Sequence, residues 1–148
     1  MPSIWNDDAR VALLARVDKL TPESKPKWGQ FTVGRMMQHC VDALRMATGE
    51  LPVKPKSGPF KLPVLKHLII YVMPWPHGAP TAPELIPTGD PNLAVAVAAV
   101  KSGMFRLAAA EPATQQWAEH PAFGKLSRRT WGALIHRHMD HHLKQFGV

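Results

Sequence analysis

The chain has 148 residues, 45% of them hydrophobic and 20% charged, which fits a single globular domain over residues 1–148 and excludes a wholly disordered chain. The formal net charge is +7, but the 18 lysines and arginines are scattered and no nucleic-acid-binding motif accompanies them, so we expect no nucleic-acid partner. The most apolar run, Leu68 to Met73, is far too short to cross a bilayer, which argues against a membrane protein.

Two helices are expected in the first third of the chain. The first should run from Asn6 to about Leu20, because Asn6 can cap it and the two aspartates that follow suit the positive end of a helix dipole. The second should begin after Thr32 as its cap and end at Gly49, and its apolar residues recur every three or four positions. Turns that contain proline separate the two helices.

Prolines shape the middle of the chain: the 15 prolines lie almost all between or just before the periodic segments. Residues 50–63 read as one loop, and a short apolar helix should follow over about 64–72. Residues 74–91 form a second, longer loop that is typical of a lid, although a stiff strap on the surface is the alternative. As a lid it would cross the open end of the helices and place Trp75, Thr81 or Glu84 in a pocket wall.

Two further helices complete the predicted all-α fold. The earlier one should take Asp90 as its cap and Pro91 as its first residue, and should reach Ala110. Its AVAVAAV run alternates as a strand would, but its alanine content and its length favour a helix. The last helix should begin after Ser127 and end near Gln145.

The last helix carries four of the eight histidines. At 3.6 residues per turn, His138 and His142 continue the apolar stripe that includes Trp131 and Ile135. Two histidines one turn apart can direct their ring nitrogens at one point about 2 Å from each, as metal ligands do. The same wheel places Arg137, Asp140 and Lys144 toward solvent, His141 on the shoulder of the stripe and His136 on its far flank.

A metal site would need at least one more ligand, and His39 on the second predicted helix is the candidate. Buried ring nitrogens need partners, and a metal ion is one way to supply them. The alternative is that the rings form hydrogen bonds with backbone carbonyls in an ordinary core. The spacing differs from the HExxH motif of metalloproteases, because the intervening residues direct no carboxylate toward the site.

Several features together carry a family resemblance: Trp28-Gly29, Met37, His39-Cys40, the HPAFG segment at 120–124, Trp131, and the tail from His138 to Phe146. With these the chain resembles the DinB-like (YfiT-like) metalloenzymes, in a branch catalogued as a domain of unknown function. The resemblance covers most of the chain after the first helix. It implies an up-down-down-up four-helix bundle, to which the residues above add long proline-rich loops and an extra short helix.

The resemblance also implies a divalent metal, with zinc or nickel as the first choices, held at His39, His138 and His142. Relatives include thiol-dependent S-transferases and isomerases, so the implied function is a metal-dependent thiol S-transferase. Its partners would be a small-molecule substrate and a low-molecular-weight thiol, and a second copy of the chain is a further candidate. Three imidazoles leave one metal position open, as in catalytic zinc sites. A metal-dependent hydrolase and a non-catalytic metal- or ligand-binding bundle are the alternatives.

The remaining reactive side chains have simpler interpretations. His120 in the HPAFG segment is expected to be a hydrogen-bonded turn residue, with a supporting position near the metal as the alternative. His67 and His77 lie in or beside the proline-rich loops and are not expected in the site, although His77 could line a pocket under the loop. Cys40 should be a buried hydrophobe. A single cysteine and a start without signal-peptide features together suggest a cytoplasmic protein.

Overall fold

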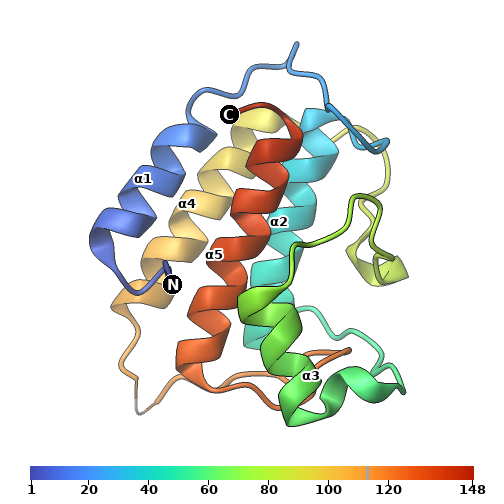
Figure 1. Cartoon of the computed structure of the whole chain (residues 1–148). Helices are drawn as coiled ribbons and strands as arrows, with labels where there is room; N and C mark the ends of the chain where they lie inside the picture. Colours follow the sequence, from blue (N-terminus) through green and yellow to red (C-terminus); the bar gives the residue numbers. More distant parts are fainter. Residues whose placement is uncertain (113) are drawn as a thin grey trace.

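The structure is a computed structural model that describes residues 1–112 and 114–148 (Figure 1). The described residues form five α-helices and three short 3-10 or π segments and contain no β-strand, so the predicted all-α class is confirmed. The α-helices are α1 (Asp7–Val17), α2 (Val33–Thr48), α3 (Pro63–His67), α4 (Leu93–Ala109) and α5 (Arg128–Gln145), and the short segments are η1 (Pro59–Lys61), η2 (Leu68–Val72) and η3 (Pro83–Leu85).

The four long helices lie side by side, and α1 and α5 run in one direction while α2 and α4 run in the other (Figure 1). Helix α2 packs against both α4 and α5, and α1 packs against α5. Their facing sides bury a core rich in methionine that includes Met36, Met37, Met104 and Met139. The long connection from α2 to α4 carries η1, α3, η2 and η3 along one side of these helices.

Three of the predicted helix caps are confirmed. The side chains of Asn6, Thr32 and Ser127 accept hydrogen bonds from backbone N–H groups three residues further on, at 2.8, 3.2 and 3.1 Å. Gly49 ends α2 with φ of 82°, a left-handed conformation that glycine adopts without the strain a side chain would bring. The caps at Thr32 and Ser127 fix where α2 and α5 begin, the two helices that carry His39, His138 and His142.

Two predicted helix boundaries are wrong. Helix α1 ends at Val17 rather than near Leu20, because the N–H groups of Lys19 and Leu20 bond to carbonyls only three residues back. Helix α4 begins at Leu93 with Asn92 as its cap, since the Asn92 side chain accepts from the Val95 N–H at 3.1 Å. Asp90 is therefore not the cap; its side chain instead accepts a hydrogen bond of 3.5 Å from the Thr32 hydroxyl.

The apolar segment predicted as one helix over 64–72 is divided into α3 and the π-helical η2. The prediction that Arg137 faces solvent is wrong, because its guanidinium donates to the carbonyls of Ile69 and Ile70 at 3.2 and 2.7 Å. Asp140 is also only partly exposed, and it pairs with Arg16 of α1 at 2.7 Å. A helical wheel could not show these contacts, because their partners come from other parts of the chain.

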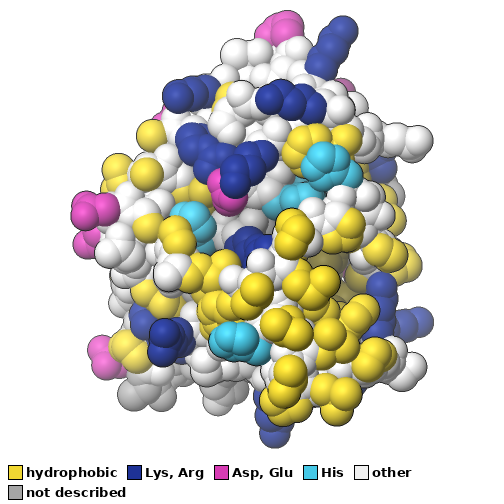
Figure 2. All heavy atoms as spheres, in the orientation of Figure 1, with side chains coloured by type: hydrophobic (Ala, Val, Ile, Leu, Met, Phe, Trp, Pro, Cys, Tyr) yellow, Lys and Arg dark blue, Asp and Glu magenta, His cyan; other side chains and the backbone are white. Residues whose placement is uncertain are grey.

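An exposed apolar surface covers η1, α3, η2 and the residue that follows them; Figure 2 shows hydrophobic side chains gathered on this side of the molecule. Its members are Phe60, Leu62, Val64, Leu68, Val72 and Met73. Within the described ranges, no helix combines the length and the apolar character that a membrane crossing requires.

Candidate metal centre

The structure brings His39, His138 and His142 together, although α2 and α5 are separated by most of the chain. One ring nitrogen from each histidine lies within 4.8 Å of the others. The Nε2 atoms of His39 and His138 are 2.9 Å apart. His142 stands edge-on to both, with ring centroids 4.9 Å from His39 and 4.7 Å from His138. Among the described residues, these are the three that form such a group.

The helices position these rings through ordinary packing. His39 lies on α2 between the buried residues Met36 and Cys40 and is itself 4% exposed. On α5, Met139 and Leu143 anchor the same stretch of helix in the core, so the residues one position before each of them meet α2. The i and i+4 spacing of His138 and His142 then stacks one ring a turn above the other.

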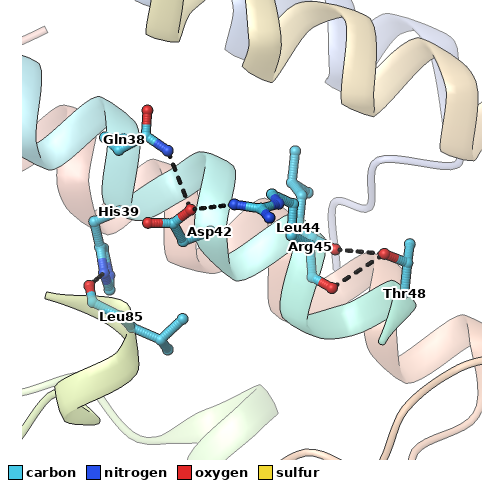
Figure 3. A network of polar contacts seen from close by, with 7 residues as sticks. All are labelled: Gln38, His39, Asp42, Leu44, Arg45, Thr48 and Leu85. Carbon is cyan, nitrogen blue, oxygen red and sulfur yellow. Dashed lines mark hydrogen bonds and ion pairs between the residues drawn. The ribbon is translucent and has the colours of Figure 1, made fainter. Parts of the chain in front are cut away.

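The loop that precedes α4 fixes the tautomer of His39. Its Nδ1 lies 2.7 Å from the carbonyl oxygen of Leu85, which belongs to η3 (Figure 3). A carbonyl oxygen can only accept, so Nδ1 carries the proton and donates it. In the neutral ring Nε2 is then a bare lone pair, and this is the nitrogen that faces His138.

A glutamine fixes His142 in the same way. Gln145 donates from Nε2 to the carbonyl oxygen of Trp28 at 2.8 Å, which orients its amide. Its Oε1 therefore faces Nδ1 of His142 at 2.8 Å, and this oxygen can only accept. His142 thus carries its proton on Nδ1 and leaves Nε2 as a lone pair. Metal-binding histidines are commonly held by such hydrogen bonds from the ring nitrogen that does not bind the metal.

All three rings are kept neutral by their surroundings. Burial is the main cause that lowers the pKa of His39, and it lowers the pKa of His142 to about 3. The pKa of His138 falls well below its ordinary value, first through burial and then through its neighbouring histidines. A neutral imidazole is the form that binds a metal ion, whereas an imidazolium cannot.

The donor set fits a divalent metal ion. Two nitrogens that bind one tetrahedral zinc at about 2.0–2.1 Å lie about 3.3 Å apart, slightly further than the 2.9 Å between His39 and His138. A hydrogen bond from a protonated Nε2 of His138 to the lone pair of His39 explains this pair in the absence of a metal. That bond leaves the Nε2 lone pair of His142 without a role, whereas a metal ion uses all three nitrogens.

A cavity of about 580 Å³ opens beside the three histidines. Its wall includes Trp75 and Thr81 of the 74–91 loop, as predicted for a lid, and Leu85 of the same loop touches His39 directly. Glu84, the third residue offered for this wall, lies outside the cavity, and its carboxylate accepts from the backbone N–H of Lys54 at 3.1 Å. The loop is therefore part of the site wall.

Aromatic rings pack next to the three clustered histidines. His77 of the 74–91 loop stacks on Trp28, with ring centroids 3.8 Å apart and planes 5° from parallel. His141 lies on the shoulder of α5, as predicted, with its ring 5.7 Å from Trp28 and 5.9 Å from Trp75. These contacts tie the loop that precedes α2 to the 74–91 loop next to His138 and His142.

His120 is a turn residue, as predicted, but it also lines the cavity. Its Nδ1 accepts hydrogen bonds from the N–H groups of Ala122 and Phe123 at 3.1 and 3.2 Å. These bonds leave Nδ1 without a proton, so the neutral ring carries its proton on Nε2. Burial lowers the pKa of His120 to about 4, so the ring is an uncharged donor at neutral pH.

Some residues of the centre were not found from the sequence. Gln145 has a recognisable signal, because it follows His142 by three positions and residues three apart face each other on a helix. The carbonyls of Leu85 and Trp28 have no recognisable signal in the sequence, because only the fold brings them to α2 and α5. Cys40 is the expected core residue: burial raises the pKa of its thiol, which contacts the sulfur of Met36 at 3.9 Å.

A comparison with known protein families matches most of the chain to one family. A family model described as "Protein of unknown function (DUF1569)" matches residues 6–147. No curated protein and no solved structure gave a match to the chain. The matched range contains the three clustered histidines, Gln145 and the 74–91 loop.

Proposed function

The chain belongs to the DUF1569 family, and we propose that it binds one divalent metal ion through His39, His138 and His142. The observation that carries the proposal is the convergence of three neutral imidazoles, two of which have their Nδ1 proton engaged by a fixed acceptor. Such an arrangement aims the remaining lone pairs at one point before any ion arrives. Zinc and nickel are the first candidates, because imidazole nitrogens suit both.

We also propose that the arrangement of α1, α2, α4 and α5 is the up-down-down-up bundle of the DinB-like metalloenzymes. The opposite directions of the two helix pairs support this (Figure 1). The positions of the histidines support it too, with one on the second long helix and two, four residues apart, on the last. Helical bundles commonly build metal sites from side chains on facing helices.

For the reaction, a metal-dependent thiol S-transfer is favoured over hydrolysis. A bound divalent metal would supply a Lewis acid that favours the ionised form of a thiol or a water molecule. Among the described residues, no aspartate or glutamate lines the cavity, so a carboxylate base for activating water is missing there. A thiol, with a pKa of about 8.5, ionises far more readily than water and needs less help from a base. His120 and His141 remain to orient or exchange protons with a bound molecule.

The metal proposal is tested with the protein as purified and after chelation. Elemental analysis and native mass spectrometry should find about one zinc or nickel ion per chain, and the chelated protein should regain it on titration. Magnesium should not compete, because it prefers oxygen ligands. If the chelated protein took up less than a tenth of an equivalent of every transition metal tried, the three histidines would be an ordinary hydrogen-bonded core and the proposal would fail.

A further inference from the structure

The charged residues that line the cavity are all positive. Two side chains with a full positive charge, Arg35 and Lys56, line it. Within residues 1–112 and 114–148, no carboxylate does so. A divalent ion held by three imidazoles, which bind metals in their uncharged form, would add two more positive charges without compensation from its ligands. A cavity with this balance favours a ligand that brings negative charge.

Arg35 is held in a fixed position with one nitrogen to spare. Its Nε and Nη2 both donate to the carbonyl oxygen of Pro87 in the 74–91 loop, at 3.1 and 2.8 Å. The guanidinium also lies over the ring of Phe31, 5.9 Å from its centroid. In the described chain it has no ion-pair partner, and Nη1 makes no hydrogen bond. A cation that is ordered but uncompensated can recognise an anion at little entropic cost.

Lys56 supplies a second charge. Its backbone N–H donates to the carbonyl oxygen of Pro121 at 2.8 Å, which ties this residue to the segment that carries His120. Its ammonium group likewise has no ion-pair partner among the described residues. The nearest carboxylate with an electrostatic effect on Lys56 is Glu84, which lies outside the cavity and accepts a hydrogen bond of 3.1 Å from the backbone N–H of Lys54.

The remainder of the wall is largely apolar and aromatic. Trp28, Phe31, Trp75 and Phe123 line it from four different segments of the chain. A cavity of about 580 Å³ is large enough for a ligand of one to three rings. A ligand that fits this cavity is therefore apolar over most of its surface and carries a negative group where it meets the positive side chains.

We infer that the cavity binds a small molecule with an apolar, ring-bearing body and an anionic group, and that Arg35 and Lys56 recognise the anionic group. This inference rests on the proposed function in that it takes the cavity beside the metal centre as the substrate site. It names the class of that substrate: an aromatic or alicyclic carboxylate, sulfonate or phosphate.

Two fluorescent probes of nearly the same shape test the inference directly. 8-Anilinonaphthalene-1-sulfonate carries an anionic group, and N-phenyl-1-naphthylamine has the same rings without it. With the metal-loaded protein the sulfonate should bind at one site per chain and on the order of tenfold tighter than the neutral probe, as one or two charge-assisted contacts provide. The Arg35→Gln and Lys56→Gln variants should each weaken the sulfonate severalfold and leave the neutral probe unchanged.

Two further variants distinguish the effect of the positive charge from a structural effect of the substitutions. Arg35→Lys keeps the charge and should retain most of the preference for the sulfonate. Lys54→Gln removes one positive charge from the same segment as Lys56 but outside the cavity, and should leave both affinities within about twofold. Equal affinities for the two probes, or equal losses in the Lys54→Gln and Lys56→Gln variants, would overturn the inference.

Repeating the titrations after chelation distinguishes this inference from the metal proposal. A preference for the sulfonate that depends on Arg35 and persists in the chelated protein supports the inference even if no metal ever binds. Normal metal uptake together with no preference for the sulfonate leaves the metal proposal intact and overturns the inference.

Discussion

The Nε2 atoms of His39 and His138 face each other at 2.9 Å, although the two residues are 99 positions apart in the chain. Because the carbonyl of Leu85 holds the proton of His39 on Nδ1, the Nε2 atom of His39 can only accept. The lone pair of this nitrogen can therefore accept a hydrogen bond from His138 or bind a metal ion. The first prediction follows from this restriction.

Substituting any one of the three histidines should reduce metal binding. His39→Ala, His138→Ala and His142→Ala should each lower occupancy at equimolar zinc by at least about tenfold, because ligands that share one ion act together. His136→Ala removes a histidine of the same helix outside the cluster and should bind metal as the unchanged protein does. Native mass spectrometry measures all four variants. Equal occupancy in His138→Ala and the unchanged protein would show that the triad is wrongly assigned.

A second prediction concerns Gln145, which orients His142 without belonging to the cluster itself. Gln145→Met keeps the volume of this buried side chain but removes the acceptor of the Nδ1 proton of His142. The affinity for zinc should fall by about 10- to 100-fold, as for other groups that hold a metal-binding histidine. Competition with a fluorescent chelator measures this loss.

A matched control variant shows whether the loss of zinc affinity comes from the lost orientation of His142. Gln38→Met removes an amide from α2 that bonds to Asp42 rather than to a clustered histidine. It should leave the zinc affinity within about twofold. If Gln145→Met also left it unchanged, while circular dichroism showed an intact fold, the role assigned to Gln145 would be refuted.

The helices were predictable from the sequence because their signals are local. Asn6, Thr32 and Ser127 cap helices through hydrogen bonds that span three residues, and Gly49 ends α2 through its own backbone conformation. The start of α4 was misplaced for the same reason, since Asp90 and Asn92 are both good caps and the sequence alone does not rank them.

The centre was only partly predictable. The pairing of His138 with His142 follows from the helical repeat, and their meeting with His39 was an expectation that rested on apolar faces and on family resemblance. Neither source could place the carbonyl of Leu85 against His39, because a loop with six prolines has no periodicity from which its path can be read. The position of the Arg35 guanidinium likewise depends on the path of this loop, because it donates a hydrogen bond to the carbonyl oxygen of Pro87.

A third prediction addresses catalysis. The zinc-loaded protein, mixed with several small thiols and one electrophile, should accelerate conjugation of at least one thiol, and His142→Ala should abolish the acceleration. The reasons are that three histidine ligands would leave one position open on a bound tetrahedral metal, and that no carboxylate lines the described cavity wall. Mass spectrometry of the products reads the outcome. No conjugation at full metal occupancy would favour hydrolysis or binding without catalysis.

A fourth prediction concerns the stability of the metal-free protein in acid. His39, His138 and His142 have lowered pKa values when folded, and regain ordinary values near 6.5 when unfolded. Below about pH 6.5 the unfolded chain therefore binds more protons than the folded chain, and the free energy of unfolding falls as the pH falls. The decline can reach about 1.4 kcal/mol per pH unit for each such histidine, until the pH approaches its folded pKa.

Urea denaturation between pH 7 and pH 4 measures this dependence. His142→Gln removes one of these groups, with a folded pKa of about 3, and should make the decline shallower. An equally steep decline in this variant would mean that His142 is not held neutral in the folded protein.

The last prediction concerns Gly34, where α2 meets the end of the 74–91 loop. A Cβ atom at Gly34 would lie 2.2 Å from the backbone oxygen of Pro91, which cannot rotate away, so Gly34→Ala should destabilise the fold by about 1–3 kcal/mol despite the better helix propensity of alanine. Gly103→Ala is the matched control within α4: its Cβ would meet only the flexible end of Leu44 at 3.1 Å, and stability should hold or rise. Because the 74–91 loop also supplies the carbonyl that orients His39, Gly34→Ala should weaken zinc binding as well. Urea denaturation and zinc titration of both variants test this, and a Gly34→Ala protein as stable as the Gly103→Ala protein would contradict the close contact between α2 and this loop.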